Sequence, residues 1–272
     1  IRLNDTKISQ KELIGTLNTV IFCPEDLQLI KGTPSGRRRF LDMEISQTSA
    51  TYYHQLMQYN RLLQQRNAIL KEYRGKQNIP LEEWDLQLAD MASFIVKKRL
   101  ESLKKINLLI DLMNRKLTGG LENLTIGYEQ PYMDNGSLEY TKEGFYERIK
   151  VALPQDRHRM TTSVGPHRDD LRFFSDEMDL KKFGSQGQQR TAVLSLKLSE
   201  LEFIKSEVGE YPVLLLDDVL SELDESRRAN LLQFIHKRIQ TFITTTDIHD
   251  FKDLKSVQFI SCEGGKVQYG QP

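Results

Sequence analysis

The chain has 272 residues, of which 39% are hydrophobic and 28% charged, a balance typical of a soluble globular protein and not of a disordered one. Its 38 basic and 38 acidic residues give a formal net charge of zero, so any affinity for nucleic acid must come from local basic clusters. Cys23 and Cys262 fit neither a disulfide framework nor a zinc site, and without a signal peptide or an apolar run of about 20 residues the sequence predicts a cytoplasmic protein with no membrane partner.

The first 120 residues predict a strand followed by a helical hairpin. Thr19–Phe22 is a short strand-like run that Cys23-Pro24 ends. From Arg37 to Tyr73, apolar residues recur at spacings of three, four and once seven, which predicts a helix with a narrow, coiled-coil-like seam. A second helix is predicted over 81–117 from its apolar stripe. Gly119-Gly120 ends it, so the two helices form an antiparallel hairpin.

The remaining residues predict a mixed lobe of helices and strands. Short strands are expected at 124–128 and 171–174, with a turn at Asp134-Asn135-Gly136 between them. An amphipathic helix is expected over 190–208, with Gly209 as its stop. The next strand, Val213–Leu216, is apolar on both faces, as in a covered parallel sheet. A helix over 225–238 and a strand over 241–245 complete an α/β succession.

Two carboxylates directly follow the most apolar strand. Asp217 and Asp218 come after Val213–Leu216, and open α/β sheets bind ligands beyond the carboxyl ends of their strands. The segment resembles a Walker B motif, in which the first carboxylate lies near Mg²⁺ or a water bound to it and the second orients or deprotonates the attacking water. A strand that ends in a structural Asp-Asp turn is the alternative.

Two further segments lie in sequence order with these carboxylates. Ser221-Glu222-Leu223-Asp224 resembles the D-loop that follows Walker B in ABC-type ATPases. Upstream, Ser185-Gln186-Gly187-Gln188 resembles the ABC signature, with Gln186 in place of the usual first Gly. A hydroxyl, a glycine that lets backbone approach closely and the amino terminus of a helix together suit a phosphate. An ordinary helix N-cap is the alternative.

In this order the motifs identify the ABC ATPase superfamily, and three more segments resemble its RecF family of DNA-repair ATPases. These are Pro24-Glu25-Asp26-Leu27-Gln28-Leu29-Ile30-Lys31-Gly32, Arg37-Arg38-Arg39-Phe40-Leu41-Asp42 and Gly165-Pro166-His167-Arg168-Asp169-Asp170. The resemblance covers about residues 19–246. It implies an α/β, ABC-type head of P-loop NTPase architecture, formed by 1–36 and 121–272. The inserted antiparallel helical arm is 37–120, with about residue 150 as an alternative end.

The resemblance also implies a function. It implies an ATP-dependent DNA-binding protein of recombinational repair and replication-fork maintenance, a clamp that dimerises with ATP and helps to load a recombinase. ATP and Mg²⁺ are the implied cofactors, and DNA and proteins of the RecR and RecO type the implied partners. Asp217 would place Mg²⁺, and Asp218 would act on the attacking water. Ser185–Gln188 would meet the γ-phosphate bound to the opposite subunit, and Ser221–Asp224 would line the interface between the subunits. The alternatives are a module that docks RecR-type partners without catalysis, and a short-armed SMC-like chromosome protein.

Three features depart from the ABC pattern. Asp218 stands where most of these ATPases have Glu, which predicts slow hydrolysis. Thr244–Asp247 occupies the switch position, where a His usually contacts the γ-phosphate, and His249 falls two residues late, so we assign it no role. The phosphate loop, Gly-x-x-x-x-Gly-Lys-Ser/Thr, is missing. The resemblance places that loop in a preceding segment, so we expect a weak DNA-dependent ATPase only in the complete protein, and no hydrolysis by this chain alone.

Local basic clusters could neutralise the phosphates of DNA. The resemblance assigns this role to Arg37-Arg38-Arg39 and Lys97-Lys98-Arg99, although solvated helix faces are the alternative for each cluster. His167 and Arg168 lie beside Asp169 and Asp170, so they form either a polar cluster near the head or an internal salt-bridged turn. We assign them no role from the sequence.

Overall fold

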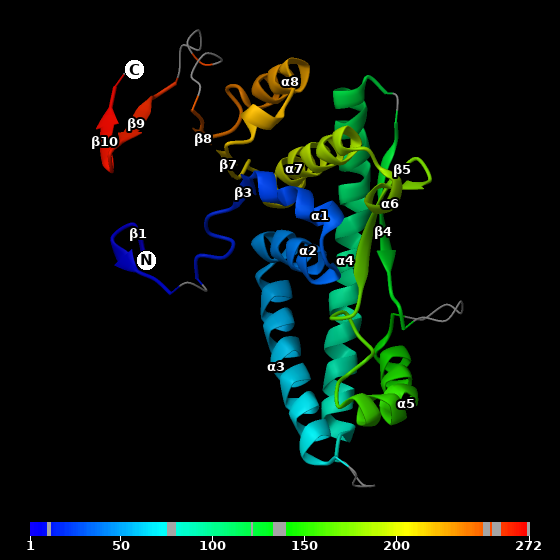
Figure 1. The fold of residues 1–272 in the computed structure, drawn as a ribbon. Helices are drawn as coiled ribbons and strands as arrows, with labels where there is room; N and C mark the ends of the chain where they lie inside the picture. Colours follow the sequence, from blue (N-terminus) through cyan, green and yellow to red (C-terminus); the bar gives the residue numbers. More distant parts are fainter. Residues whose placement is uncertain are drawn as a thin grey trace.

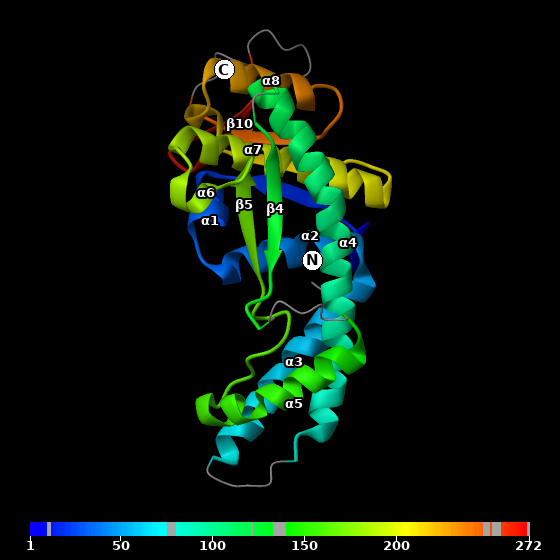
Figure 2. The ribbon, with the colours of Figure 1, turned by 90° about the vertical axis from the view of Figure 1, so that its right-hand side faces the viewer.

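The computed structural model describes residues 1–9, 12–74, 80–120, 122–132, 140–246, 251 and 257–270. The strands β3 to β8 and most of the short helices form one lobe, and a second, purely helical lobe projects from it; the long helix α4 runs through both (Figure 1, Figure 2). The predicted α/β class with an inserted helical hairpin is confirmed. The turn at Asp134–Gly136 and His249 lie outside the described residues. No described helix is both long and apolar enough to cross a bilayer.

A parallel sheet of three strands carries the predicted motifs. Its order is β3 (Thr19–Phe22), β7 (Val213–Asp217) and β8 (Thr241–Thr244). On one face Val20 and Leu214 are each 1% exposed and pack toward helix α7 (Gln186–Val208). On the other face Ile21 and Phe242 are 51% and 53% exposed. The prediction that this sheet is covered on both faces is therefore wrong for this chain.

Helix α7 lies at the centre of the molecule. It ends, as predicted, at Gly209, which adopts a left-handed φ of 93° that glycine tolerates best. It begins earlier than predicted, and it is not amphipathic, because every residue from Thr191 to Leu201 is buried. The sheet, α4 (Glu82–Thr118) and α2 (Pro34–Thr48) surround it. Polar side chains in this helix therefore need partners inside the protein.

One such set of partners forms a charged cluster inside the core. Lys197 of α7 lies 3.3 Å from Asp26 and 3.4 Å from Glu200. Glu44 of α2 belongs to the same cluster and is 4% exposed. Burial raises the pKa of Glu44 to about 7, against the opposing effect of the Lys197 charge. Burial also raises the pKa of Glu200 well above its ordinary value. The cluster therefore favours at least one protonated carboxyl in the folded protein.

An antiparallel sheet leads into α7. It consists of β4 (Leu124–Glu129), β5 (Asp170–Ser175) and β6 (Met178–Asp179), which confirms both strands predicted here. In β5 buried and half-buried residues alternate, because alternate side chains point to the two faces of the sheet. The short helix α6 (Leu180–Phe183) then connects this sheet to the amino end of α7.

The helical hairpin is present, with one break that was not predicted. Ser49 has an extended φ of −145° and separates α2 from α3 (Ala50–Glu72), whose first turn its side chain caps. Within α3, Tyr52, Tyr59 and Leu70 form the buried seam, as the spacing predicted. α4 has 37 residues, a length of about 55 Å at 1.5 Å per residue. Because it runs unbroken through both lobes, the boundaries between head and arm stay predictions.

The other elements are short or peripheral. Helix α5 (Lys142–Arg159) packs against α4 and α3 and was not predicted; Pro154 interrupts its sequence pattern. The chain between β7 and β8 forms η2 (Leu220–Glu222) and α8 (Glu225–Ile235). After β3 follow η1 (Pro24–Leu27) and α1 (Gln28–Lys31). Two exposed hairpins are β1 (Arg2–Leu3) with β2 (Thr6–Lys7), and β9 (Ile260–Glu263) with β10 (Lys266–Tyr269).

Candidate functional site

The two predicted Walker B carboxylates lie at the carboxyl end of the parallel sheet. Asp217 and Asp218 are both exposed. Thr244, at the end of β8, donates its hydroxyl to Asp217 Oδ1 at 2.6 Å and accepts from the Asp218 amide at 3.1 Å. Asp218 has a left-handed φ of 50°, a conformation that Asp tolerates better than most residues. The threonine thus holds one oxygen of Asp217 in place, while both carboxylates face solvent.

These residues fit a magnesium–nucleotide complex better than an isolated metal ion. Within the described parts of the chain, no three His, Cys, Asp or Glu residues converge as a metal site. Mg²⁺ is usually bound by one or two carboxylates, with water and phosphate oxygens at its other positions. Asp217 and Asp218, two adjacent exposed carboxylates at a strand end, could supply these carboxylate ligands.

The predicted D-loop is a rigid turn attached to Asp218. The Ser221 hydroxyl donates to the Asp218 carbonyl at 2.7 Å, and Leu223 is buried. Asp224 accepts from the amide of Arg227 at 2.9 Å and so caps α8. The side chain of Glu222 is not among the described atoms. The hydrogen bond from Ser221 therefore holds this turn next to Asp218.

The predicted signature forms the amino end of α7. Ser185 is the N-cap: its hydroxyl accepts from the Gln188 amide at 3.2 Å, and the Gln188 side chain accepts from the Ser185 amide at 3.0 Å. Gln188 also donates to Glu122 at 3.0 Å. Among the described residues, the amides of Gln186 and Gly187 donate no hydrogen bond.

The N-cap interpretation of Ser185 is thus confirmed, but the cap does not explain the glycine. A Cβ added to Gly187 would meet only Ser185 Oγ, at 4.0 Å, so the packing of this chain does not demand glycine there. Open space above two free amides at a helix amino terminus is what a phosphate requires. This end of α7 therefore fits a nucleotide phosphate.

The signature and the two Walker B carboxylates belong to different elements, the amino end of α7 and the carboxyl end of β7. Arg190 in the second turn of α7 lines a small pocket together with Val219 and Leu223, so the D-loop packs against α7. In contrast, no hydrogen bond or ion pair between described side chains joins Ser185–Gln188 to Asp217 or Asp218.

The predicted DNA-binding clusters divide into inner and outer residues. Arg37 is 3% exposed and bonds Asp170 at 2.7 and 2.8 Å. Arg99 is 2% exposed and bonds Asp42 at 2.9 Å and the Pro166 carbonyl at 2.7 Å. DNA could reach either guanidinium only if these ion pairs broke, so we withdraw both from the predicted set. The exposed or half-buried members are Arg38, Arg39, Lys97 and Lys98, the last paired with Glu101 at 2.7 Å.

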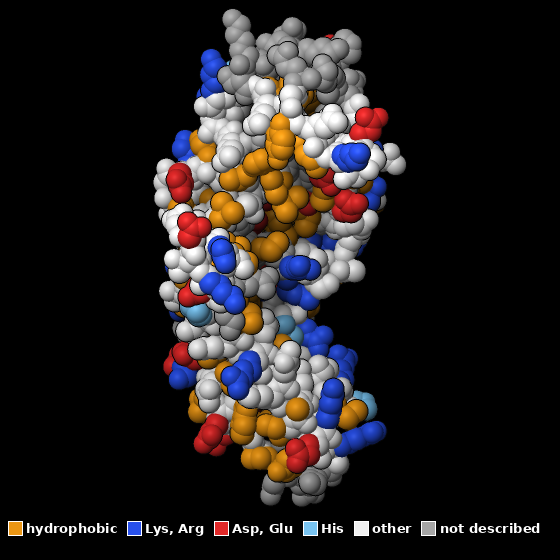
Figure 3. All heavy atoms as spheres, turned by 90° about the vertical axis from the view of Figure 1, so that its left-hand side faces the viewer, with side chains coloured by type: hydrophobic (Ala, Val, Ile, Leu, Met, Phe, Trp, Pro, Cys, Tyr) orange, Lys and Arg blue, Asp and Glu red, His pale blue; other side chains and the backbone are white. Residues whose placement is uncertain are grey.

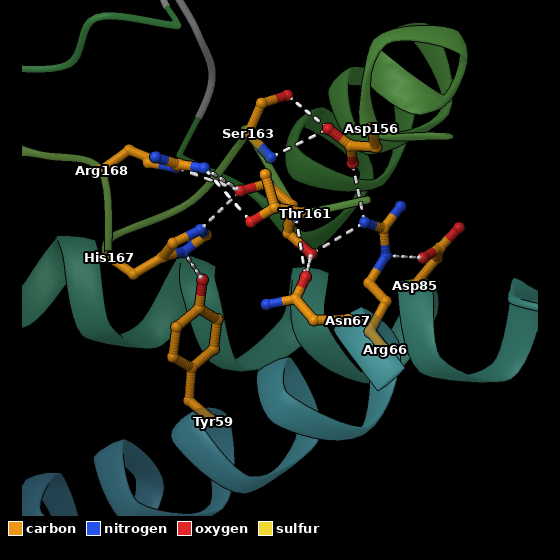
Figure 4. A network of polar contacts seen from close by, with 10 residues as sticks. Tyr59, Arg66, Asn67, Asp85, Asp156, Thr161, Ser163, His167 and Arg168 are labelled. Carbon is orange, nitrogen blue, oxygen red and sulfur yellow. Dashed lines mark hydrogen bonds and ion pairs between the residues drawn. The ribbon is translucent and has the colours of Figure 1, made fainter. Parts of the chain in front are cut away.

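His167 and Arg168 belong to a network of polar contacts between α3, α5 and the loop before β5, in which Arg168 itself is exposed (Figure 4). His167 Nε2 donates to the Thr162 carbonyl at 3.0 Å, so in the neutral ring Nδ1 accepts from the Tyr59 hydroxyl at 2.6 Å. Burial lowers the pKa of His167 to about 4, so the imidazole is neutral at pH 7. Arg168 donates twice to the same carbonyl, at 3.0 and 2.8 Å. The salt-bridged turn is not found, because no ion pair joins His167 or Arg168 to a carboxylate of a described residue; the two residues belong to a polar cluster.

Sequence reasoning missed the centre of this network. Arg66 is fully buried and donates to Asp85 at 2.6 Å, Asp156 at 2.7 Å and Thr162 at 2.9 Å (Figure 4). Its partners come from α4, α5 and the loop that leads to β5, far from Arg66 in the sequence. We call the arginines Arg37, Arg66 and Arg99, with the carboxylates that they bind, the lobe joint. No local motif could have signalled these pairings.

A parallel sheet with a Walker B-like edge, a signature-like helix start and a short helical arm defines an ABC-type ATPase head. No family model matches the chain, but individual proteins do. The chain is 49% identical to the DNA replication and repair protein RecF of Alkaliphilus oremlandii over 262 residues, 93% of this chain and 71% of that protein. It is 46% identical to the RecF of Clostridium botulinum strain Eklund 17B over 97% of this chain and 73% of that protein.

Solved structures agree with these relatives. The structure of the recombination mediator protein RecF-ATP in the RecFOR pathway superposes with a TM-score of 0.88 at 36% identity, covering 99% of this chain and 72% of that one. The RecF-ATPrS structure has the same TM-score and identity and covers 98% of this chain. The chain belongs to the RecF family.

Proposed function

We propose that this chain is part of an ATP-dependent DNA-binding protein of recombinational repair and replication-fork maintenance, in which two subunits enclose ATP between them. The proposal is supported by the lack of any hydrogen bond or ion pair between described side chains of Ser185–Gln188 and those of Asp217 and Asp218, which we therefore treat as two half-sites. In a two-fold dimer each signature could meet the carboxylate edge of the partner, and both sites would close together. Binding of ATP would thus control dimerisation and the hold on DNA.

Each named residue has a role in this scheme. Asp217 would bind the Mg²⁺ that accompanies ATP, and this ion would offset the charge of the phosphates. Asp218 would orient the attacking water. Across the interface, the Ser185 hydroxyl and the helix start at Gln186, Gly187 and Gln188 donate to the γ-phosphate. Ser221–Asp224 line the same interface. Because Asp is shorter by one methylene than the Glu usual at the position of Asp218, we expect slow hydrolysis.

The uncovered face of the parallel sheet supports the proposal that a further segment completes the head. Ile21 and Phe242 are more than half exposed there, and burial of such side chains is favourable by about 25 cal/mol per Å². The sequence contains no phosphate loop, so we propose that a preceding segment brings the loop and covers this face. On this account the complete protein is a weak DNA-dependent ATPase, and this chain alone does not hydrolyse ATP.

The relatives supply the proposed partners. They are named DNA replication and repair proteins, and the solved structures are assigned to the RecFOR pathway. We therefore propose DNA and proteins of the RecR and RecO type as partners. The place of action would be the cytoplasm, where bacterial DNA lies.

The proposal is tested by Ser185→Arg in the complete protein. A bulky side chain at this open helix start should abolish ATP-dependent dimerisation, measured by light scattering, while equilibrium binding of ATP to the monomer is unchanged. Thr141→Arg is the matched control, because Thr141 also caps a helix, accepting from the Gly144 amide at 3.1 Å. Each change should destabilise its helix by about 1 kcal/mol. Dimerisation retained by Ser185→Arg would contradict the proposal.

A further inference from the structure

Basic side chains gather where the two lobes meet. Figure 3 shows a recess at the waist of the molecule, with Lys and Arg side chains on both sides of it. At this junction α2 begins with Arg38 and Arg39 in its first turns, and α5 ends with Arg159 in its last turn. Arg168 lies in the loop between α5 and β5. Arg39, Arg159 and Arg168 are exposed, and Arg38 is half-buried.

Hydrogen bonds place Arg38 and Arg168 next to each other, while Arg39 follows Arg38 in α2 and Arg159 ends α5 two residues before Thr161. Arg38 donates to the carbonyl of Asp169 at 2.7 Å, directly beside Arg168. Both guanidiniums are close enough to His167 for their positive charges to oppose its protonation, in addition to the larger effect of burial on its pKa. The Arg168 side chain packs on Thr161 and Thr162, which follow the last turn of α5 after a single residue. The surface therefore spans the head lobe and the arm lobe.

The carboxylates near this surface point inward, to other arginines. Asp170 binds Arg37, Asp42 binds Arg99, and Asp156 binds Arg66. Asp169 is buried against Arg99 and the Tyr128 hydroxyl. By contrast, Arg38 and Arg168 bond only carbonyl and hydroxyl oxygens, and Arg39 and Arg159 form no ion pair with a described residue. The outer guanidiniums are thus available to an anion from solvent.

We propose that Arg38, Arg39, Arg159 and Arg168 form a binding surface for the phosphate backbone of DNA, and the choice of DNA rests on the proposed function. Several cations across a recess fit a ligand with regularly spaced phosphates, and guanidinium binds phosphate in a bidentate manner. Two of the four are already held in place by backbone carbonyls, so little side-chain entropy is lost on binding. Contacts of this kind carry no sequence information, so binding is independent of base sequence.

The surface also connects DNA to the geometry of the arm. Arg38 and Arg39 belong to α2, and Arg159 is the last residue of α5, which packs on the arm hairpin. A backbone that touches both would bridge the lobe joint from outside. Bound DNA should therefore hold the arm and the head in the relative position seen here.

The test measures the binding of duplex DNA to the double variant R39E/R159E by fluorescence anisotropy at a series of salt concentrations. Affinity should fall at least tenfold, and the slope of log K against log salt should decrease by about 2, since each phosphate contact contributes about 0.9. R39K/R159K keeps both charges and should keep the slope. K104E/K116E, at exposed positions of α4, makes the same change in net charge and should have a smaller effect.

The outcomes separate this surface from the proposed function. Arg39 and Arg159 are exposed, so thermal unfolding should show that R39E/R159E folds. If the unaltered protein bound no DNA at any salt concentration, the proposed function and this surface would both be contradicted. If it bound DNA and R39E/R159E behaved like K104E/K116E, the surface alone would be wrong.

Discussion

Charged side chains are buried and paired at the lobe joint, whereas at the two proposed half-sites they are exposed to solvent. At the joint, Arg66 is fully buried and bonded to two carboxylates. At the half-sites, Asp217, Asp218 and Ser185 are exposed and keep hydrogen-bonding capacity unused. A buried charge without partners is strongly destabilising, whereas an exposed one is solvated. The fold therefore depends on the joint, whereas the residues of the proposed half-sites lie on the surface.

Breaking the joint should have the largest effect on stability. Arg66→Met leaves Asp85 and Asp156 buried without their cation, so we expect the free energy of unfolding to fall by about 3–5 kcal/mol. Urea denaturation followed by circular dichroism measures it. Arg61→Met, on the exposed face of the same helix, is the control and should change stability by less than about 0.5 kcal/mol. A loss below about 1 kcal/mol for Arg66→Met would show that the joint does not hold the fold.

A second prediction concerns the charged cluster in the core. The folded pKa of Glu44 is raised to about 7 from 4.5, so the folded state binds the proton more tightly than the unfolded state. The stabilisation is complete below about pH 4.5 and is lost as pH rises through about 7. The free energy of unfolding should fall by up to about 3 kcal/mol over this range. The effect of His167 on stability is opposite. Its pKa is lowered to about 4 in the folded protein, so its contribution to stability is lost as pH falls below 6.5.

The variant Glu44→Gln isolates the first of these effects. It cannot ionise, so its stability should decline less than that of the unaltered protein between pH 5.5 and 7.5. His167 is present in both proteins, and its contribution cancels in the comparison. Melting temperatures at matched pH values provide the measurement. Parallel pH profiles for the two proteins would mean that Glu44 does not hold the proton.

The smallest effect is expected at the half-sites. Asp218→Asn removes an exposed charge and keeps a residue that tolerates the left-handed backbone, so the free energy of unfolding should change by less than about 0.5 kcal/mol. The same denaturation experiment measures it. Destabilisation comparable to that of Arg66→Met would remove the contrast between the joint and the half-sites.

Local patterns predicted the elements that depend on local physics. The strand at Thr19–Phe22, the long helix that ends at Gly119 and the stop at Gly209 all follow from periodicity and backbone preference. The sequence also placed Asp217 and Asp218 at a strand end. It did not predict α5, because Pro154 breaks the apolar pattern, nor the break at Ser49.

What the sequence missed depends on distant partners. Arg37 and Arg99 have the appearance of solvent-exposed basic clusters, yet Asp170 and Asp42 hold them inside the protein. The helix over 186–208 has polar residues at regular spacing, but Lys197 pairs in the core with Asp26, a residue far away in the sequence. Pairings between residues so far apart are decided by packing, which no window of sequence contains.

The central claim is that each nucleotide site is shared between two subunits. It is tested most directly by mixing Ser185→Arg and Asp218→Asn forms of the complete protein in equal amounts and measuring ATP hydrolysis. Each form alone should be inactive. A mixed two-fold dimer has one site with both halves intact, so the mixture should recover activity, up to about half of the unaltered activity if every dimer is mixed. No recovery, with mixed dimers shown to form, would contradict the account.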